Sequence, residues 1–366
     1  MGPEYERMVS NRMNVCIIGH TERNYLPYME KYVRFFEENG VEYDIICWER
    51  EDTQKKASEH EFPFVEEARP GKFYKFLSYM RFRRHVVSCL KKKKYDRVIV
   101  LTTVPAIALG GYLKSHFAGR YLFDIRDYSF ERLGFYRKWV NALIKNSALT
   151  TISSHGFMEF LEPNPKIIIN HNITPYEPES QTASLAQKQV INIGFIGGVR
   201  YFDENTFLID KLKNTFRYQL WYIGKPTPDC DLQSYCAQHE VTNVSFIGKF
   251  TNDQKPELYK SVDMINSIYG SDSLEVTTAL PNRLYEACIF KKPIISSKGT
   301  YLGEVIKQYG LGFVVDAEND DILAIVNDYV EHFNPEIFIQ HCNDFLAMIA
   351  QDEENLQNAL KKFIQE

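Results

Sequence analysis

The chain has 366 residues, which is too long for one ordinary hydrophobic core and sufficient for two domains. Its composition, 44% hydrophobic and 25% charged, is that of a globular protein. The net charge of −5 excludes a nucleic-acid binder that acts through its overall charge.

The cysteines and the longest apolar run indicate the cellular compartment that we expect for the chain. Seven cysteines are scattered without a CxxC pair, and nothing resembles a signal peptide, so we expect reduced thiols in a cytoplasmic chain. The longest apolar run, residues 98–113, contains two threonines, a proline and two glycines, whereas a membrane-spanning helix needs about 20 clean apolar residues. Residues 1–12 read as an irregular leader or a cloning remnant outside the fold.

Strands and helices alternate through the first half of the chain. Buried strands are predicted at 13–20, 41–49, 95–103, 120–127, 148–154 and 166–173. Helices are predicted at 25–40, 73–94, 104–117 and 135–147. This alternation favours a parallel, doubly wound sheet, and it defines an N-terminal domain over 13–173.

A polar segment separates this half from the next. Residues 174–189 contain two prolines and no apolar period, which is typical of an interdomain linker. Strands then resume at 190–198, 218–225, 244–250, 262–269, 292–297 and 312–316, within a C-terminal domain over 190–334. The tail, 335–366, reads as helical and is a candidate to pack back on the N-terminal domain. The α/β chain therefore consists of two Rossmann-like domains with parallel sheets, whose ligands we expect at a central cleft.

The helix predicted at 73–94 is basic and aromatic. Residues 70–100 hold ten Lys and Arg against one acid, Asp96. With Tyr74, Phe76, Tyr79 and Phe82 beside its cations, the helix is a candidate for contact with an anionic membrane surface. The alternative is a core-facing aromatic stripe with a solvated basic face.

Two segments of the second half suit a phosphate. In IGFIGGVR a strand ends at Gly197-Gly198, where the backbone can approach a ligand, and Arg200 follows with paired N–H donors. In LPNRLYEA, Asn282 is predicted to cap a helix whose free N–H groups and Arg283 would hold an anion. The alternatives are a tight turn with a surface arginine and an ordinary helix start.

Three further groups are weaker candidates. Glu286 lies one turn into that helix, where it could accept two hydrogen bonds from a sugar diol or merely favour the helix dipole. The matched segments YIGKP and FIGKF, with Lys225 and Phe250, end strands near the expected cleft or are ordinary turns. In the first half, His20 and the pair Asp124 and Asp127 follow strands and could bind an acceptor hydroxyl. They could equally be a structural histidine, a partner of Arg126 and a turn cap.

Most familiar motifs are missing from the sequence. There is no GxGxxG, P-loop, HExxH or GxSxG, and the histidines and cysteines lack metal-ligand spacing.

Six segments in order resemble the retaining glycosyltransferases of family 4, which have the GT-B fold. They are GFIGGVR (194–200), LWYIGK (220–225), VSFIGKF (244–250), LYKSVDMINSIY (258–269), LPNRLYEACIFKKPII (280–295) and GEVIKQYGLGFVV (303–315). The first half is matched only by its layout and by INHNI (169–173).

The resemblance implies a nucleotide-diphosphate-sugar donor on the second domain and a glycan or lipid-linked acceptor on the first. Arg200 matches the arginine on the donor diphosphate, and Glu286 matches the second glutamate of the E-x7-E motif, which holds the donor ribose. Thr278 stands at the position of the first glutamate, and the nearby Glu275 or Thr277 could take its role. Asn205 stands at the position of a lysine, and Arg283 could supply the missing phosphate cation. A branch with a Pro-Asn-Lys/Arg-x-x-Glu pattern also lacks the first glutamate, and this chain fits it.

The family mechanism needs no metal or other cofactor. Arg200, Arg283 and the helix amides would stabilise the departing diphosphate, which itself takes the acceptor's proton, while Asp127 orients the acceptor. The resemblance further implies surface polysaccharide biosynthesis at the inner face of the cell membrane. The alternatives are a nucleotide-sugar 2-epimerase of the same fold and a catalytically degenerate partner subunit.

Overall fold

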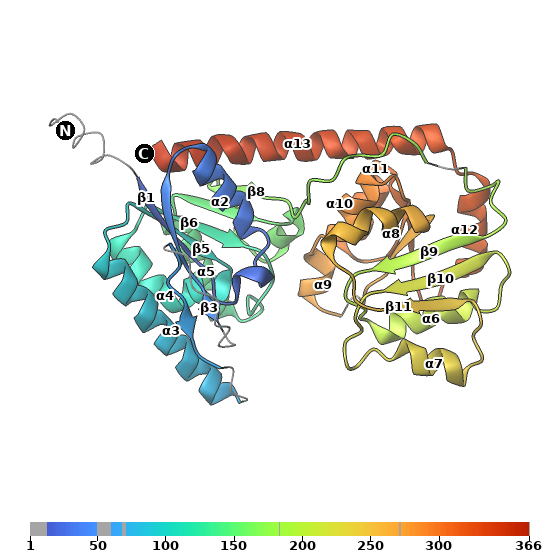
Figure 1. The fold of residues 1–366 in the computed structure, drawn as a ribbon, viewed down its shortest axis with the longest axis horizontal. Coiled ribbons are helices and arrows are strands. Elements are labelled where there is room, and N and C mark those ends of the chain that lie inside the picture. Colours follow the sequence, from blue (N-terminus) through green and yellow to red (C-terminus); the bar gives the residue numbers. More distant parts are fainter. Residues whose placement is uncertain (1–12, 50–59, 68–70, 183, 271, 366) are drawn as a thin grey trace. The chain divides into compact units, whose positions relative to one another are not determined.

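The computed structural model describes residues 13–49, 60–67, 71–182, 184–270 and 272–365 of the chain, which divides into two compact units (Figure 1). The first unit comprises Met1–His171 and Asp352–Glu366, and the second comprises Asn172–Gln351. The expected leader, residues 1–12, lies outside the described residues.

The first unit is built on a parallel six-stranded sheet with the order β2-β1-β5-β6-β7-β8. Its strands are β1 (Asn14–Ile18), β2 (Glu42–Ile46), β5 (Arg97–Leu101), β6 (Tyr121–Ile125), β7 (Leu149–Ile152) and β8 (Ile167–Ile169). A separate parallel pair consists of β3 (Trp48–Glu49) and β4 (Phe64–Val65).

Helices cover both faces of this sheet. They are η1 (Arg23–Tyr25), α2 (Met29–Glu38), α3 (Lys72–Lys92), α4 (Thr103–His116), α5 (Gly134–Asn146) and η2 (His155–Glu159). Because the strand order reverses at β1 and crossovers are right-handed, α2 lies on one face and α3, α4 and α5 lie side by side on the other. The apolar side chains of α2 form one core cluster with alternate residues of β1 and β5.

The second unit has the same architecture in a six-stranded parallel sheet of order β11-β10-β9-β12-β13-β14. Its strands are β9 (Ile191–Ile196), β10 (Tyr218–Ile223), β11 (Val244–Ile247), β12 (Met264–Ser267), β13 (Ile294–Ser297) and β14 (Gly312–Val315).

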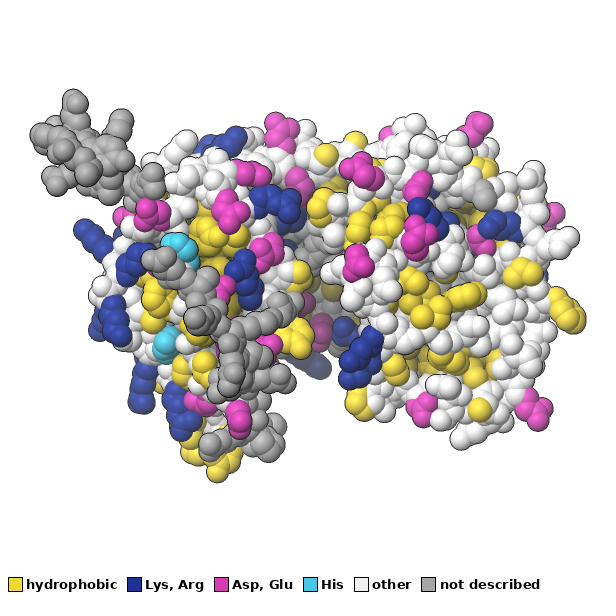
Figure 2. Space-filling model, viewed as in Figure 1, with side chains coloured by type: hydrophobic (Ala, Val, Ile, Leu, Met, Phe, Trp, Pro, Cys, Tyr) yellow, Lys and Arg dark blue, Asp and Glu magenta, His cyan; other side chains and the backbone are white. Residues whose placement is uncertain are grey.

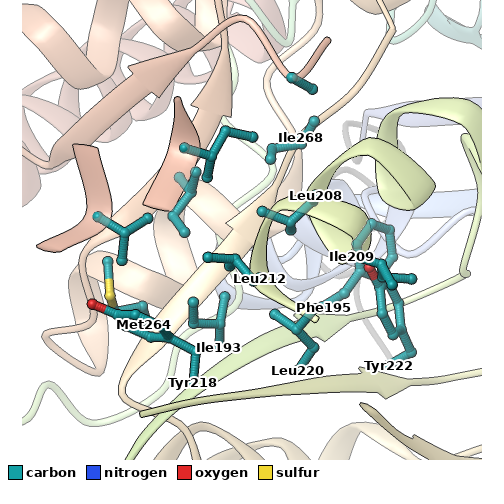
Figure 3. Close-up of a cluster of buried hydrophobic side chains, with 14 of the residues drawn as sticks. Ile193, Phe195, Leu208, Ile209, Leu212, Tyr218, Leu220, Tyr222, Met264 and Ile268 are labelled. Atoms are coloured by element: carbon teal, nitrogen blue, oxygen red, sulfur yellow. The ribbon is translucent and has the colours of Figure 1, made fainter. Parts of the chain in front are cut away.

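Its helices form two layers, each with its own core cluster. They are α6 (Phe202–Leu212), α7 (Leu232–Gln238), η3 (Asn252–Gln254), α8 (Lys255–Ser261), α9 (Leu274–Thr278), α10 (Asn282–Ile289), α11 (Tyr301–Tyr309) and α12 (Ile322–Glu331). Figure 3 shows one cluster, in which Leu208 and Leu212 of α6 lie over Ile193 and Phe195 of β9. The other cluster buries α10 and α11.

The C-terminal tail is one long helix, α13 (Pro335–Gln365). Its residues from Asp352 onward belong to the first unit, where Leu356 and Leu360 join the core cluster of α2. Two polar contacts fix this end. His171 Nε2 lies 2.9 Å from Asp352 Oδ2, and Lys31 Nζ lies 2.7 Å from Glu353 Oε1.

The predicted fold class is confirmed, and the predicted strands are found close to their expected places. One helix is shorter than predicted. Residues 25–40 were expected to be helical throughout, but α2 begins only at Met29 because Pro27 disfavours helical backbone at Leu26, whose ψ is 56°. Within the described ranges, every helix is too short or too polar to cross a membrane.

Candidate active site

The strand order of the second unit reverses between β9 and β12. The chain therefore leaves the carboxyl ends of these two adjacent strands in opposite directions, which is the place where open α/β sheets bind ligands. The loop after β9 carries Gly197 to Tyr201, and the segment after β12 leads through α9 to α10.

The β9 loop is held by its neighbour, the loop after β10. Val199 N–H donates to Lys225 O at 3.0 Å, and Thr227 N–H donates to Val199 O at 2.9 Å. Gly224 has φ +139°, and a Cβ there would lie 1.9 Å from Gly197 O. The glycine of YIGKP is therefore required by the protein's own backbone, which fits the ordinary turn that the sequence left open as an alternative.

Gly198 differs from Gly224. It is exposed, and the nearest atom to an added Cβ is Arg200 Nε at 3.9 Å, so no described part of the chain requires a glycine there.

Asn205, which replaces a lysine of the resembled family, has a structural role. It is fully buried in α6, and its amide nitrogen donates to Arg200 O and Tyr201 O, both at 2.8 Å. Its Oδ1 accepts from Asn266 Nδ2 of β12 at 3.0 Å. Asn205 thus ties the β9 loop to β12 and fixes the backbone of Arg200, while Tyr201 takes the left-handed φ of 65°.

Arg200 itself is exposed on this fixed loop. Among the described residues, no carboxylate lies within the 4.0 Å ion-pair distance of its guanidinium. Lys225, after β10, is also exposed. These cations stand at the carboxyl edge of the sheet, where an anionic ligand could reach them.

The start of α10 corrects one prediction. Asn282 was expected to cap the helix, but Pro281 occupies the N-cap position and no side chain caps this end. Pro281 has an extended backbone, with φ −76° and ψ 153°. Leu284 N–H donates to Pro281 O at 3.0 Å, whereas the N–H groups of Asn282 and Arg283 have no acceptor among the described residues and are open to another one. Asn282 is exposed beside them.

Arg283 follows and is buried, with 7% of its surface exposed. Its Nη1 donates to Asn266 O at 2.9 Å and its Nη2 donates to the Tyr269 hydroxyl. The guanidinium also lies 3.7 Å from the ring centre of Phe195. All these partners are neutral, and no described carboxylate forms an ion pair with it. A buried cation without a counter-ion is costly, so the site favours an anion beside Arg283.

Aromatic side chains connect the two arginines. The Tyr201 and Tyr269 rings meet edge to face at 4.9 Å, and Tyr269 accepts the bond from Arg283. Burial raises the pKa of Tyr201, and Tyr269 and Glu275 raise it further, while Arg200 and Arg283 act to lower it. Arg200, Arg283 and Glu275 therefore all lie within electrostatic range of Tyr201.

Thr278 is not presented to a ligand. It is fully buried at the end of α9, and its hydroxyl donates to Leu274 O. Glu275 is exposed in the first turn of the same helix. If an acid serves this part of the site, Glu275 is the better placed.

Glu286 is buried and already holds two partners. Lys255 Nζ lies 2.6 Å from its Oε1, and the Tyr259 hydroxyl donates to its Oε2 at 2.8 Å. Burial, together with Glu286, raises the pKa of Tyr259 well above its ordinary value. A carboxylate accepts about four hydrogen bonds, so Glu286 keeps lone pairs for further donors, although only 1% of its surface is exposed. Phe250 is half-buried after β11 and packs against the core cluster of α10.

In the first unit, the buried charged residues Asp124 and Arg126 are paired with each other. Asp124 lies in β6 with no exposed surface, its Oδ2 is 2.9 Å from Arg126 Nε, and its Oδ1 accepts from the Thr151 hydroxyl at 2.7 Å. Arg126 also donates to Asn170 O at 3.0 Å. Burial alone would lower the pKa of Arg126, but Asp124 and the nearby tyrosines outweigh it and raise that pKa. Asp124 was expected on the acceptor side, but this closed network does not present it to an acceptor.

His20 lies where the strand order of the first unit reverses. It follows β1, and its Nδ1 lies 3.0 Å from the hydroxyl of Thr102, which follows the adjacent strand β5. Thr102 has φ 72°, an uncommon conformation for a β-branched residue. Asp127 is exposed after β6. Across the described residues, no three His, Cys, Asp or Glu side chains gather as metal ligands would.

The sequence from residue 179 to 363 matches the family described as Glycosyl transferases group 1. The match covers half of the chain, including every donor-side residue described above. The chain belongs to the group 1 glycosyltransferases. No curated protein matches it.

Solved structures show the same GT-B fold for this glycosyltransferase. Sucrose-phosphate synthase from Thermosynechococcus elongatus is 12% identical, with 97% of this chain and 100% of that chain covered and a TM-score of 0.68. HepE of Anabaena, solved in complex with UDP, is 14% identical, with 96% and 100% covered and a TM-score of 0.66. The lipopolysaccharide outer core galactosyltransferase WaaB is 16% identical, with 96% and 99% covered and a TM-score of 0.65.

Several residues of the glycosyltransferase site were not anticipated from the sequence. They are Lys255, Tyr259, Asn266, Tyr269 and Thr102. Each acts through a partner more than ten residues away, and only Asn266, a polar residue inside the buried strand β12, carried a local signal.

Proposed function

We propose that this glycosyltransferase moves a sugar from a nucleotide-diphosphate sugar to a glycan or lipid-linked glycan, with retention of configuration and without a metal. The observation that supports it most is the pair of arginines at the strand reversal of the second unit. Arg200 and Arg283 have no carboxylate partner among the described residues, so an anion such as a diphosphate completes their environment.

The proposed mechanism follows from where charge develops. Cleavage of the sugar–phosphate bond leaves additional negative charge on the diphosphate, which Arg200, Arg283 and the free amides of α10 would stabilise. Each preorganised donor of this kind contributes about 3–4 kcal/mol to transition-state stabilisation. The departing phosphate oxygen would take the proton of the acceptor hydroxyl.

Glu286 would hold the ribose of the donor. Lys255 and Tyr259 keep its carboxylate oriented, and its remaining lone pairs would accept the two hydroxyls of a diol. Lys225 and Phe250 follow β10 and β11, Asn282 begins α10, and all three would contact the rest of the nucleotide.

Glu275 would contact the donor sugar in place of the glutamate that Thr278 replaces. It is exposed, and it lies close enough to Tyr201 to influence that residue's pKa. A change of position for this acid implies a changed fit to the hydroxyls of the donor sugar.

The first unit would hold the acceptor. His20 and Asp127 are its candidate contacts, with Asp127 orienting the acceptor hydroxyl. We propose that such an acceptor belongs to surface polysaccharide biosynthesis, at the inner face of the cell membrane.

Calorimetry with UDP, GDP, ADP, CMP and their sugars, with and without Mg²⁺, tests the donor site. We expect one nucleoside diphosphate to bind without metal and Arg200→Ala to weaken it. Arg217→Ala is the matched control, because Arg217 precedes β10 at the opposite edge of the same sheet. Binding that Arg217→Ala weakens equally would contradict the assignment of the site.

The two alternatives give different outcomes. A degenerate partner subunit would bind no nucleotide at all. A 2-epimerase would convert the nucleotide sugar to its C2 epimer without an acceptor, which proton NMR of the donor detects. The same spectra, recorded with an acceptor, give the anomeric configuration of the product and so test retention.

A further inference from the structure

The helical layer formed by α3, α4 and α5 contains no acidic residue. The three sequences together hold eleven Lys and Arg, seven of them in α3, and not one Asp or Glu. The whole chain has more acids than bases, 48 against 43, so this layer departs strongly from the average. Figure 2 shows the dark-blue side chains along the flank where Figure 1 draws α3.

The start of α3 protrudes from its unit. Phe73, Tyr74, Lys75 and Phe76 are all exposed, the aromatic ones at 69%, 51% and 61%. Four consecutive helical residues point in all directions around the axis, so this turn has no buried side among the described residues. In Figure 2, hydrophobic side chains gather at this end.

The aromatic residues of α3 therefore divide into two groups. Further along the helix, Phe82 is fully buried and stacks on Trp48 at 5.7 Å, and Tyr79 meets the same Trp48 edge to face. These two form the core-facing stripe that the sequence left open as an alternative. Only the first turns expose aromatic rings.

A second exposed apolar group precedes and begins α5. Phe130, Leu133, Phe135 and Trp139 are exposed at 54%, 47%, 56% and 53%. The cations Arg132, Arg137 and Lys138 lie between them and are exposed as well. Glu131, the one acid in the segment, is buried.

Contacts place the two groups at one edge of the unit. The Thr103 hydroxyl, at the start of α4, lies 2.7 Å from the hydroxyl of Ser129, which precedes α5, and α4 packs against both α3 and α5. Tyr136 of α5 lies near enough to Tyr79 of α3 for the two to interact electrostatically. The three helices therefore lie side by side, α3 against α4 and α4 against α5. We refer to the exposed residues 73–76 and 130–139 with the cations of α3–α5 as the α3–α5 surface.

We infer that the α3–α5 surface docks this protein on an anionic lipid bilayer. Phenyl and indole rings with a leucine enter the interfacial region of a bilayer, and flanking Lys and Arg are attracted to anionic headgroups. An acid-free layer of three helices matches an extended negative surface. Nucleic acid fits less well, because the apolar side chains of α3 protrude from a helix end instead of lining a groove for bases.

The inference deepens the proposed function and rests on it in one respect, the class of acceptor. An enzyme held at a bilayer by its acceptor unit would act on an acceptor carried by lipid. Bilayer binding itself does not depend on catalysis, so its failure and the failure of donor binding are distinguishable.

The test measures binding of the full chain to phosphatidylcholine vesicles with and without phosphatidylglycerol. Trp139 is an exposed tryptophan, whereas Trp48 is buried and Trp221 is half-buried, so insertion should shift the emission to the blue. Trp139→Phe should keep most of the binding and lose the shift. We expect binding only with phosphatidylglycerol, weakened on the order of 30-fold or more by Arg137→Glu/Lys138→Glu, since each cation near such a surface contributes about fivefold.

Lys361→Glu/Lys362→Glu is the matched control. It makes the same change of charge at exposed positions of α13, whose neighbours Leu360 and Phe363 pack with α2 on the opposite face of the sheet. Equal loss of binding in both double variants would overturn the assigned surface. Absence of binding to anionic vesicles, or tighter binding to single-stranded RNA without a shift in Trp139 emission, would overturn the lipid partner.

Discussion

The carboxyl edges of the two sheets show what the same architecture can be used for. Both units have six parallel strands and one reversal of strand order, and both place arginines at the edge. In the first unit, Arg126 is neutralised by Asp124 inside a closed network. In the second, Arg283 is equally buried but has only neutral partners. The difference teaches that the partners of a charge, and not its position in the fold, decide whether it is structural or available to a ligand.

The strongest test of this comparison removes each buried arginine in turn. Arg126→Met should lower the free energy of unfolding by about 3–5 kcal/mol, because it leaves Asp124 buried without a counter-ion. Arg283→Met should change stability by less than about 1 kcal/mol while weakening donor binding, since no acid is left unpaired. Urea unfolding of both variants measures this, and an equal loss of stability would remove the distinction.

Arg200→Ala should give the largest loss of activity. The charge that develops on the departing diphosphate would lose one preorganised donor, which costs about 3–4 kcal/mol, or a factor of about 10²–10³ in kcat/KM. The melting temperature should stay unchanged because the side chain is exposed. A variant with unchanged turnover would show that Arg200 is a surface residue of the turn.

Lys255→Met should raise the KM for the donor by at least about tenfold. It removes a charge-assisted hydrogen bond of about 1.5–3 kcal/mol from Glu286, whose orientation for the ribose would be lost. Lys255→Arg keeps the charge and should restore part of the affinity. Should Lys255→Met change stability alone, with the KM intact, the ion pair would be structural.

Substitutions of the two glycines in the β9 and β10 loops should have different effects, one on the stability of the protein and the other on donor binding. Gly224→Ala should destabilise the protein by about 1–2 kcal/mol or more, because its φ is +139° and the backbone of Gly197 blocks a Cβ. Gly198→Ala should leave stability within about 1 kcal/mol and weaken donor binding. Thermal unfolding and calorimetry on both variants test the pair, and the reverse pattern would contradict it.

The smallest effect expected concerns pH and the end of α13. Burial lowers the pKa of His171 below its ordinary value of 6.5, although Asp352 and Glu353 act against this and Lys31 adds to it. The unfolded chain then binds a proton at His171 more readily than the folded chain does. The contribution of neutral His171 to the free energy of unfolding is therefore complete above about pH 6.5 and is lost as the pH falls below it. His171→Gln should reduce the fall in unfolding free energy between about pH 7.5 and 5.5, by up to about 1 kcal/mol.

The sequence by itself determined the elements and the fold class. Apolar runs of strand length alternate with helical periods, and these local patterns depend on neighbours along the chain, which any reader of the sequence can see. The predicted strand end at Gly197-Gly198, Arg200 after it and Arg283 in LPNRLYEA were visible for the same reason. The bounds of α2 were missed by four residues because Pro27 acts on the backbone of Leu26.

Only the tertiary structure decided which charged residues have partners. Asp124 and Arg283 are both polar residues near strand or helix ends in the sequence, yet one is neutralised and the other is not. Asn205 looked like a missing cation and holds the backbone of Arg200, and Glu286 depends on Lys255 and Tyr259. Burial and ion pairing arise from residues far apart in the chain, so the chemistry of the site emerges only when the strands are assembled side by side.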